Sequence, residues 1–180
     1  MGTSRFYSSI FFTLLLSVAS ASIADELGSL AENPVRFAVL GDRTGGAQEG
    51  IFEQIVTEAE RLKPEFVMTV GDFIDGYSTD TTQLMSEWDT VLTMFEPFSV
   101  PLHFVAGNHD ISYDVAEPIY RRFAGEPNYS FDYRGLHFTV LDNSRWEAST
   151  ELPEDYITWL ENDLRQSQGA TYTLVFMHKP

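Results

Sequence analysis

Short apolar runs alternate with longer amphipathic runs between residues 35 and 110. The short runs are rich in β-branched and aromatic residues and predict buried strands, whereas the longer ones repeat apolar residues at helical spacing. The predicted strands are VRFAVLG (35–41), FVMTVGD (66–72) and VPLHFVAGNHD (100–110), and the predicted helices are QEGIFEQIVTEAERLKP (48–64) and DTTQLMSEWDTVLTMFEP (80–97). The first helix has Ile51, Ile55, Ala59 and Leu62 on one face. This βαβαβ order is typical of a parallel sheet with right-handed crossovers.

The pattern changes in the second half of the chain. Its predicted elements are a helix in ISYDVAEPIYRRFAG (111–125), strands in YSFDYRG (129–135) and LHFTVLDN (136–143), a helix over 153–168, and a last strand in TYTLVFMH (171–178). Only a turn at Gly135 separates the two adjacent strands, so they predict an antiparallel hairpin. Ile157, Leu160 and Leu164 are expected to face inward from the following helix. We therefore expect an α/β fold with at least six strands, in two packed mixed β-sheets flanked by helices.

The first 24 residues differ from the rest of the chain. Arg5 is their only charge, and the apolar stretch IFFTLLLSVA leads into the small residues ASASIA. This pattern predicts a signal peptide over residues 1–24, with cleavage after Ala21 or Ala24. We therefore expect an exported protein, periplasmic or extracellular, with its domain over 25–180. Because the apolar stretch is short, we expect no stable membrane span after cleavage.

The acidic balance limits the partners of the chain. The sequence has 27 acidic and 11 basic residues, and losing Arg5 with the signal peptide leaves 10 basic residues and a net charge of −17. Such a surface repels nucleic acid and anionic lipid, so nucleic acid binding is not expected. A phosphate-bearing substrate would need a local positive centre, for which a metal ion is the obvious candidate. The chain has no cysteine, which excludes disulfides and thiolate chemistry.

Each of the first three predicted strands ends in a cluster of polar residues and glycine. The clusters are GDRTGG (41–46), GDFIDG (71–76) and GNHD (107–110). Ligands bind at the carboxyl ends of the strands in open α/β sheets, so Asp42, Asp72 and Asn108 are expected to converge on one crevice. Any one Gly-Asp pair alone would more simply be a turn in which the Asp caps the next helix.

These residue types suit metal binding better than the alternatives. GDRTGG has neither the GxGxxG spacing of a dinucleotide site nor the ending of a P-loop, and the chain contains no GxSxG elbow. The carboxylate of Asp72 can bridge two cations, and the neutral carbonyl of Asn108 leaves its metal a strong Lewis acid. His178, after the last strand, adds an imidazole nitrogen. Two divalent ions would lower the pKa of a shared water and clamp the oxygens of a phosphoryl displacement.

In this order and spacing, the motifs GDRTGG, VGDFIDG, VAGNHD and FMHKP resemble those of the calcineurin-like metallophosphoesterase superfamily. The family pattern is D-x-H, GDxxD, GNHD/E, an isolated His and then GHxH, and the match spans residues 35–180. The resemblance implies an α/β/β/α sandwich, two divalent metal ions (Mn, Fe or Zn) and hydrolysis of a phosphate ester by a metal-activated hydroxide.

Carried over by position, the resemblance also assigns roles to residues. Asp42 would ligate the first metal, Asp72 would bridge both, and Asn108 and His178 would ligate the second. His109 would face the substrate phosphate as a catalytic group, and Asp110 would orient its ring.

The chain departs from the family pattern in two places. Position 44 carries Thr44 in place of the histidine of D-x-H, so the first metal loses a nitrogen ligand; Arg43 and Thr44 either contact the substrate or are turn residues. Asp75 stands where the purple acid phosphatase branch has a tyrosine, which argues against that branch.

The second departure is that the GHxH motif is absent, so we expect a domain that is incomplete at its C-terminus. Asp142 is a further candidate beside the site, with a turn role as the alternative.

The primary hypothesis is an exported metal-dependent phosphoesterase acting on a phosphomonoester or phosphodiester. A non-catalytic module that binds one metal or a phosphate ligand is the alternative, motivated by Thr44. A structural or adhesion domain ranks last, since it leaves the polar strand ends unexplained. The motifs address the phosphate and leave the esterified group open. His103 and His137 lie inside predicted strands and are expected to be packed or surface side chains rather than ligands.

Overall fold

The computed structural model describes residues 34–145 and 152–179. The fold described below is that of the unit Arg36–Pro180. The predicted signal peptide lies outside the described residues. Among the helices that are described, none is long and apolar enough to cross a membrane.

The first sheet contains the three predicted strands of the first half of the chain. They are β1 (Phe37–Leu40), β2 (Phe66–Thr69) and β3 (Leu102–His103), in the order β1-β2-β3, and both pairings are parallel. The predicted βαβαβ order is thereby confirmed. β3 is shorter than predicted because the N–H of Val105 donates to the side-chain hydroxyl of Thr69, at 2.9 Å, instead of continuing the ladder. The chain then turns away from the sheet toward the GNHD motif.

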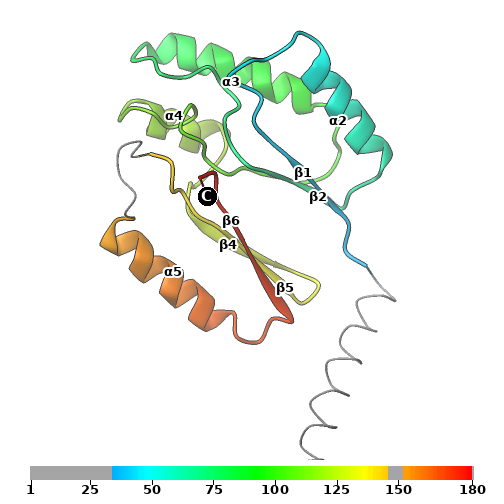
Figure 1. Cartoon of the computed structure of the whole chain (residues 1–180), viewed down its shortest axis with the longest axis vertical. Helices are drawn as coiled ribbons and strands as arrows, with labels where there is room; N and C mark the ends of the chain where they lie inside the picture. The colour runs from blue at the N-terminus through cyan, green and yellow to red at the C-terminus, as the bar shows by residue number, and fades with distance from the viewer. Residues whose placement is uncertain (1–33, 146–151, 180) are drawn as a thin grey trace, which may run out of the picture. The chain divides into compact units, whose positions relative to one another are not determined.

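Three helices pack on one face of this sheet (Figure 1). They are α2 (Ile51–Arg61), α3 (Thr81–Phe95) and α4 (Ala116–Phe123). The carboxylate of Asp80 caps α3 by accepting from the backbone N–H groups of Thr82 and Gln83. Buried apolar side chains of these helices and of the sheet form one core, in which Trp88 of α3 and Tyr120 of α4 are fully buried.

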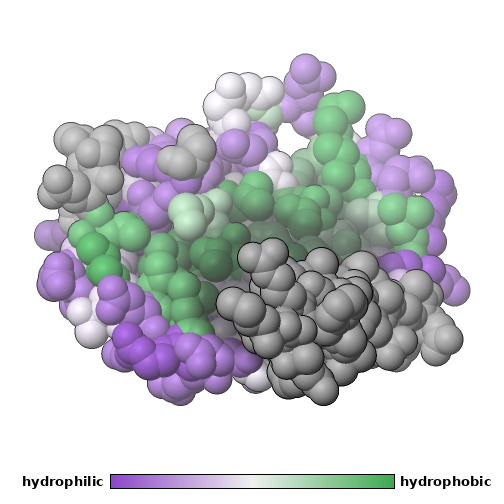
Figure 2. Space-filling view, turned by 60° about the horizontal axis from the view of Figure 1, so that its bottom comes forward, coloured by the Kyte–Doolittle hydropathy of each residue, from purple (hydrophilic) through white to green (hydrophobic). Residues whose placement is uncertain are grey.

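Only Ala59 of the apolar stripe predicted for α2 is buried. Ile51, Ile55 and Leu62 are 46%, 45% and 75% exposed. Phe52 and Val56 are buried beside Ala59, and the ring of Phe52 packs edge-on against aromatic rings of the core. The helix is thus apolar on two sides. Figure 2 shows apolar side chains gathered in a band between polar rims on the face viewed there.

The second sheet contains the predicted hairpin and the last strand. Its strands are β4 (Tyr129–Tyr133), β5 (Leu136–Val140) and β6 (Tyr172–Phe176). β4 and β5 are antiparallel, as predicted, and β6 pairs parallel to β5, so this sheet is mixed. Helix α5 (Glu154–Gln166) connects β5 to β6.

Helix α5 is attached differently from what its pattern predicts. None of its residues is buried, and Ile157 and Leu164 are exposed rather than inward. The helix turns Asp163 to the sheet instead, where the carboxylate accepts from Ser130, His137 and Thr139. His137 is also bonded to Asp132, 2.7 Å away, so its imidazole lies between two carboxylates. A polar network therefore fixes α5 to the second sheet.

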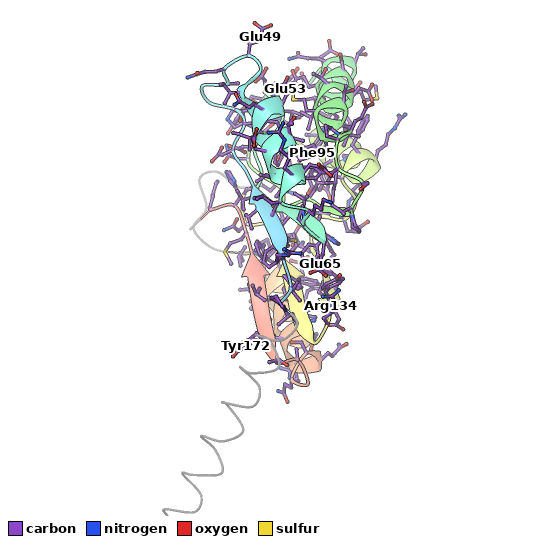
Figure 3. The ribbon with its side chains drawn as sticks, turned by 90° about the vertical axis from the view of Figure 1, so that its right-hand side faces the viewer. Glu49, Glu53, Glu65, Phe95, Arg134 and Tyr172 are labelled. Atoms are coloured by element: carbon purple, nitrogen blue, oxygen red, sulfur yellow. The ribbon has the colours of Figure 1, made fainter. Side chains whose placement is uncertain are left out.

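The two sheets pack against each other through a layer of aromatic rings. The ring of Phe66, on β2, lies 5.2 Å from the ring of Phe138 and 5.7 Å from that of Phe131. At the rim of this layer, Glu65 accepts from the hydroxyl of Tyr133 at 2.7 Å and pairs with Arg134 at 2.8 Å (Figure 3). This packing brings the end of β6 next to the ends of the strands of the first sheet.

Candidate functional site

The loops after β1 and β2 are joined through their backbones. The N–H of Asp42 donates to the carbonyl of Gly71, and the N–H groups of Arg43 and Thr44 both donate to the carbonyl of Asp72. The hydroxyl of Thr44 contacts the same carbonyl, at 3.2 Å. Asp42 and Asp72 both have left-handed backbone, with φ of 54° and 59°. The loops after the first two strands therefore form one backbone framework.

The third strand end approaches this framework so closely that only glycine fits. A side chain on Gly107 would collide with the backbone and carboxylate of Asp72, and one on Gly71 would collide with Gly107 and with the ring of His178. Close approach of this kind is one of the reasons for glycine at a fixed position. The predicted convergence of the strand ends is thus confirmed, and it depends on these glycines.

The side chain of Asp110 holds this backbone framework together. It does not orient the ring of His109, so the prediction for Asp110 was wrong. Its fully buried carboxylate accepts backbone N–H groups from Asp72, Phe73, Ile74 and Gly107, at 2.8 to 3.2 Å. Burial raises the pKa of Asp110 to about 6, although its N–H partners favour the charged form. The residue is a positioning group for the loops after β2 and β3.

The carboxylate of Asp72 lies at the centre of the site. One oxygen, Oδ1, accepts the backbone N–H of His109 at 3.0 Å. The other, Oδ2, lies 3.4 Å from Nε2 of His178 and 4.0 Å from Nε2 of His109. Burial alone would raise the pKa of Asp72, but hydrogen bonds from His178 and from the His109 backbone outweigh it, and the net pKa is lowered. Asp72 is therefore held as an anion between two imidazole rings.

His178, after β6, is oriented by the backbone of the first sheet. Its Nδ1 lies 2.7 Å from the carbonyl of Val70, which can only accept, so Nδ1 carries a proton. Nε2 is thereby directed to Oδ2 of Asp72 and to Oδ1 of Asn108, 3.1 Å away. The hydrogen bond to Asp72 raises the pKa of His178 to about 9. A backbone carbonyl on one ring nitrogen is a common way to present the other nitrogen to a metal.

Two residues that the sequence analysis did not assign hold these ligand candidates in place. The amide nitrogen of Asn108 donates to the hydroxyl of Tyr77 at 2.9 Å, while its oxygen faces His178. The amide oxygen of Asn143 accepts the backbone N–H groups of His178 and Lys179. Tyr77 follows Gly76 in a loop and is far from Asn108 in the sequence, so no local sequence pattern indicates that the two side chains are in contact.

The ring of His109 directs its Nε2 atom toward the carboxylate of Asp72. Nδ1 lies 2.7 Å from the carbonyl of Asp75, so this nitrogen carries the proton, and Nε2 is the atom nearest to Asp72. The contribution of Asp75 comes from its backbone, since its side chain is exposed. The ring of Tyr77 packs edge-on against the ring of His109, with centroids 4.8 Å apart. His109 thus presents one ring nitrogen, oriented by the backbone, beside the cluster.

The remaining candidates lie around this cluster. Asp42 has an exposed side chain and acts on the site through charge, since it contributes to the raised pKa of His178. Arg43 donates to the carbonyl of Phe73 at 2.7 Å. Arg43 and Thr44 therefore make the loop contacts of turn residues. Asp142 also has a turn role, because its Oδ1 accepts from Ser144 and from the backbone of Arg145.

His103 and His137, expected to be packed or surface side chains rather than ligands, are both packed. His103 stacks on Phe131 with ring centroids 3.8 Å apart, and burial lowers its pKa. His137 is buried between the carboxylates of Asp132 and Asp163.

The donor set at the site suits one divalent cation. Oδ2 of Asp72, Oδ1 of Asn108 and Nε2 of His178 face one another, and a cation between them would replace the proton on Nε2. Across residues 34–145 and 152–179, no three His, Cys, Asp or Glu side chains are grouped as a metal site. A cation held here would therefore need the amide oxygen of Asn108 beside the carboxylate of Asp72 and the imidazole of His178.

Comparison with curated proteins finds phosphatases. The serine/threonine-protein phosphatase CPPED1 of Danio rerio is 28% identical over 158 residues, which cover 78% of this chain and 51% of the relative. CPPED1 of Homo sapiens is also 28% identical, over 157 residues, with 78% and 50% of the two chains covered. The chain spans about half the length of the curated relatives it matches.

Solved structures share the fold. A dimetal phosphatase from Danio rerio superposes with a TM-score of 0.65 at 18% identity, covering 81% of this chain and 70% of that one. A purple acid phosphatase from yellow lupin superposes with a TM-score of 0.59 at 17% identity, covering 81% of this chain and 30% of the other. The expected fold class is thereby confirmed.

The family model of the calcineurin-like phosphoesterases matches residues 35–180. This match covers the whole fold described above and confirms the resemblance seen in the motifs. The chain therefore belongs to the calcineurin-like phosphoesterase family.

Proposed function

We propose that this protein is a metal-dependent phosphoesterase that hydrolyses a phosphomonoester or a phosphodiester. The observation that carries the proposal is the convergence of Asp72, Asn108 and His178 on one point, with Nε2 of His109 directed at the same carboxylate. Family membership and the named activities of the relatives support it. The second metal is part of the proposal, with Asp42 and Asp72 as its ligands.

Each side chain has a distinct task in this proposal. Asp72, Asn108 and His178 hold the cation, and Val70 and Tyr77 fix the direction of two of these ligands. A divalent cation bound there would supply Lewis acidity, polarising a phosphoryl oxygen and lowering the pKa of a water. His109 donates a proton from Nε2 to the departing ester oxygen, while the carbonyl of Asp75 keeps the opposite nitrogen protonated.

The test measures metal binding and hydrolysis on the same protein. The full-length protein is stripped with a chelator and titrated with Mn²⁺, Fe²⁺ or Zn²⁺ by calorimetry, and hydrolysis of an aryl phosphate monoester and diester is followed in parallel. We expect activity that depends on the added metal. Asp72→Asn should weaken metal binding and lower kcat/KM by at least about 100-fold. His109→Gln should lower kcat/KM by a similar factor while metal binding is retained.

The matched control is Asp89→Asn, which changes an exposed carboxylate on α3, outside the cluster. Activity that survives Asp72→Asn would rule the site out. Binding of one cation without turnover of either ester would favour the second candidate, a non-catalytic binding module. The observation behind that candidate is Thr44, whose hydroxyl and N–H are both directed at the Asp72 carbonyl in the position where the family pattern has a histidine.

We also propose that the protein is exported, on the basis of the residues 1–24 alone. The mass of the protein recovered from the periplasm or the medium should correspond to cleavage after Ala21 or Ala24. A product that retains residues 1–24 inside the cell would contradict this.

A further inference from the structure

Two exposed tyrosines lie beside the catalytic candidate His109. Tyr77 is 38% exposed and its ring lies edge-on to the ring of His109, with centroids 4.8 Å apart. Tyr113 is 45% exposed and lies edge-on to Tyr77, at 6.2 Å. The two tyrosines come from different loops, and a bond from the N–H of Tyr77 to the hydroxyl of Ser112 joins these loops. Tyr77 and Tyr113 thus form an aromatic surface that extends outward from His109, which we call the aromatic wall.

The backbone of Tyr77 indicates that this placement is maintained against strain. Its φ is 46°, in the left-handed region that bulky residues seldom adopt. The strained loop is held from both sides, because the N–H of Gly76 donates to Glu87 and that of Tyr77 to Ser112. Strained residues that their surroundings hold in place are concentrated at functional sites.

The wall continues into a cleft of about 420 Å³. The cleft is lined by Thr79, Ser112, Tyr113, Asp114, Val115 and Arg145. Arg145 pairs with Glu117 at 2.5 Å and lies 3.4 Å from Asp142, so its charge is compensated within the protein. The carboxylate of Asp114 would repel an anion. The cleft therefore suits an uncharged group better than a second phosphate or a carboxylate.

We propose that Tyr77 and Tyr113 form the subsite for the leaving group, and that the substrate is the phosphate ester of an aromatic alcohol. This rests on the proposed function, in which the leaving oxygen lies next to His109. The rest of the alcohol must then lie beside the ring of Tyr77. A flat aromatic group packs on tyrosine rings in offset or edge-on geometry, and an aliphatic alcohol gains less from the same contact.

The test compares ligands that cannot be hydrolysed. Benzylphosphonate replaces the ester oxygen of an aryl phosphate with a methylene group, and cyclohexylmethylphosphonate has the same size without the aromatic ring. Binding of both to the Mn²⁺-loaded full-length protein is measured by calorimetry. We expect the aromatic ligand to bind about fivefold more tightly. Tyr113→Ala should reduce that preference to less than about twofold, and Tyr113→Phe should keep it.

Tyr172→Ala serves as the matched control, because it removes a tyrosine of similar exposure, 44%, from β6 (Figure 3). It should leave the preference unchanged. Equal binding of the two phosphonates to the wild type, or a preference that survives Tyr113→Ala, would overturn the subsite. Hydrolysis of esters without any aromatic preference would overturn this inference alone, whereas absence of both hydrolysis and phosphonate binding would overturn the proposed function as well.

To separate two sources of the aromatic alcohol, hydrolysis of phenyl phosphate is compared with that of a phosphotyrosyl peptide. A higher kcat/KM than for phosphoserine supports the subsite only if Tyr113→Ala reduces the advantage, because a phenolate is also the better leaving group. A preference for phosphoserine contradicts it.

Discussion

Removal of the buried carboxylate of Asp110 should destabilise the whole domain. Four backbone N–H groups, from Asp72, Phe73, Ile74 and Gly107, donate to this carboxylate, and all four residues are buried. A buried donor left without a partner costs about 1 to 3 kcal/mol, so Asp110→Ala should lower the free energy of unfolding by at least about 4 kcal/mol. Domains of this size have a total of about 5 to 15 kcal/mol. The variant should therefore be close to unfolding at room temperature.

A conservative substitution tests the reasoning more finely. An asparagine at position 110 keeps one acceptor oxygen, but its NH₂ group faces two of the four donors, so Asp110→Asn should lose about half as much stability, roughly 2 kcal/mol. Urea unfolding followed by tryptophan fluorescence suits the measurement, because Trp88 is fully buried in the core. The control is Asp114→Ala, which removes an exposed carboxylate four positions later and should leave the unfolding midpoint unchanged.

The outcome that would refute this reasoning is specific. If Asp110→Ala unfolds within about 1 kcal/mol of the wild type, the bonds to Asp110 do not carry the framework. Equal losses in the alanine and asparagine variants would show that the charge matters and the number of acceptors does not.

Three further predictions concern the sheets and the amide ligand. The carboxylates of Asp132 and Asp163 outweigh burial and raise the pKa of His137, so its contribution to stability is complete below about pH 6.5 and is lost as the pH rises through the raised value. The urea midpoint of the wild type should fall from pH 6 to pH 9 more steeply than that of His137→Gln, and parallel curves would contradict this. Phe66→Ala should cost about 3 to 5 kcal/mol in urea unfolding, because a ring that is 1% exposed leaves a cavity between the two sheets; a loss below 1 kcal/mol would show that the aromatic layer repacks. Tyr77→Phe removes the hydroxyl bonded to the amide of Asn108 and should weaken Mn²⁺ binding in calorimetry by about fivefold at unchanged stability. Unaltered affinity would show that this hydroxyl does not position the amide.

The sequence predicted the main parts of the fold because the signals were local. The alternation of apolar runs with helical repeats predicted the six strands in their order, and the polar strand ends predicted that Asp42, Asp72 and Asn108 would converge. His178, which meets Asp72 and Asn108 in the structure, was added as a ligand from the last strand. Ligands at strand ends need no knowledge of loop geometry, since parallel strands end at the same edge of a sheet.

The errors came from contacts that no periodicity encodes. Apolar residues of α5 were expected to face inward, yet the helix is held by Asp163, whose partners lie 24 to 33 positions earlier. Asp110 was assigned to the ring of His109 from the family resemblance, carried over by position. A carboxylate can satisfy backbone donors as readily as an imidazole, and only the turn geometry shows which it does.

The left-handed backbone of Asp42 and Asp72 limits how these positions can evolve. Glycine, asparagine and aspartate are the residues that tolerate this conformation. A single nucleotide change in an aspartate codon reaches both glycine and asparagine, but each removes the negative charge. The same step also reaches glutamate, which keeps the charge but disfavours the backbone. One-step mutants at either position therefore lose the charge or strain the loop, and aspartate alone satisfies both demands.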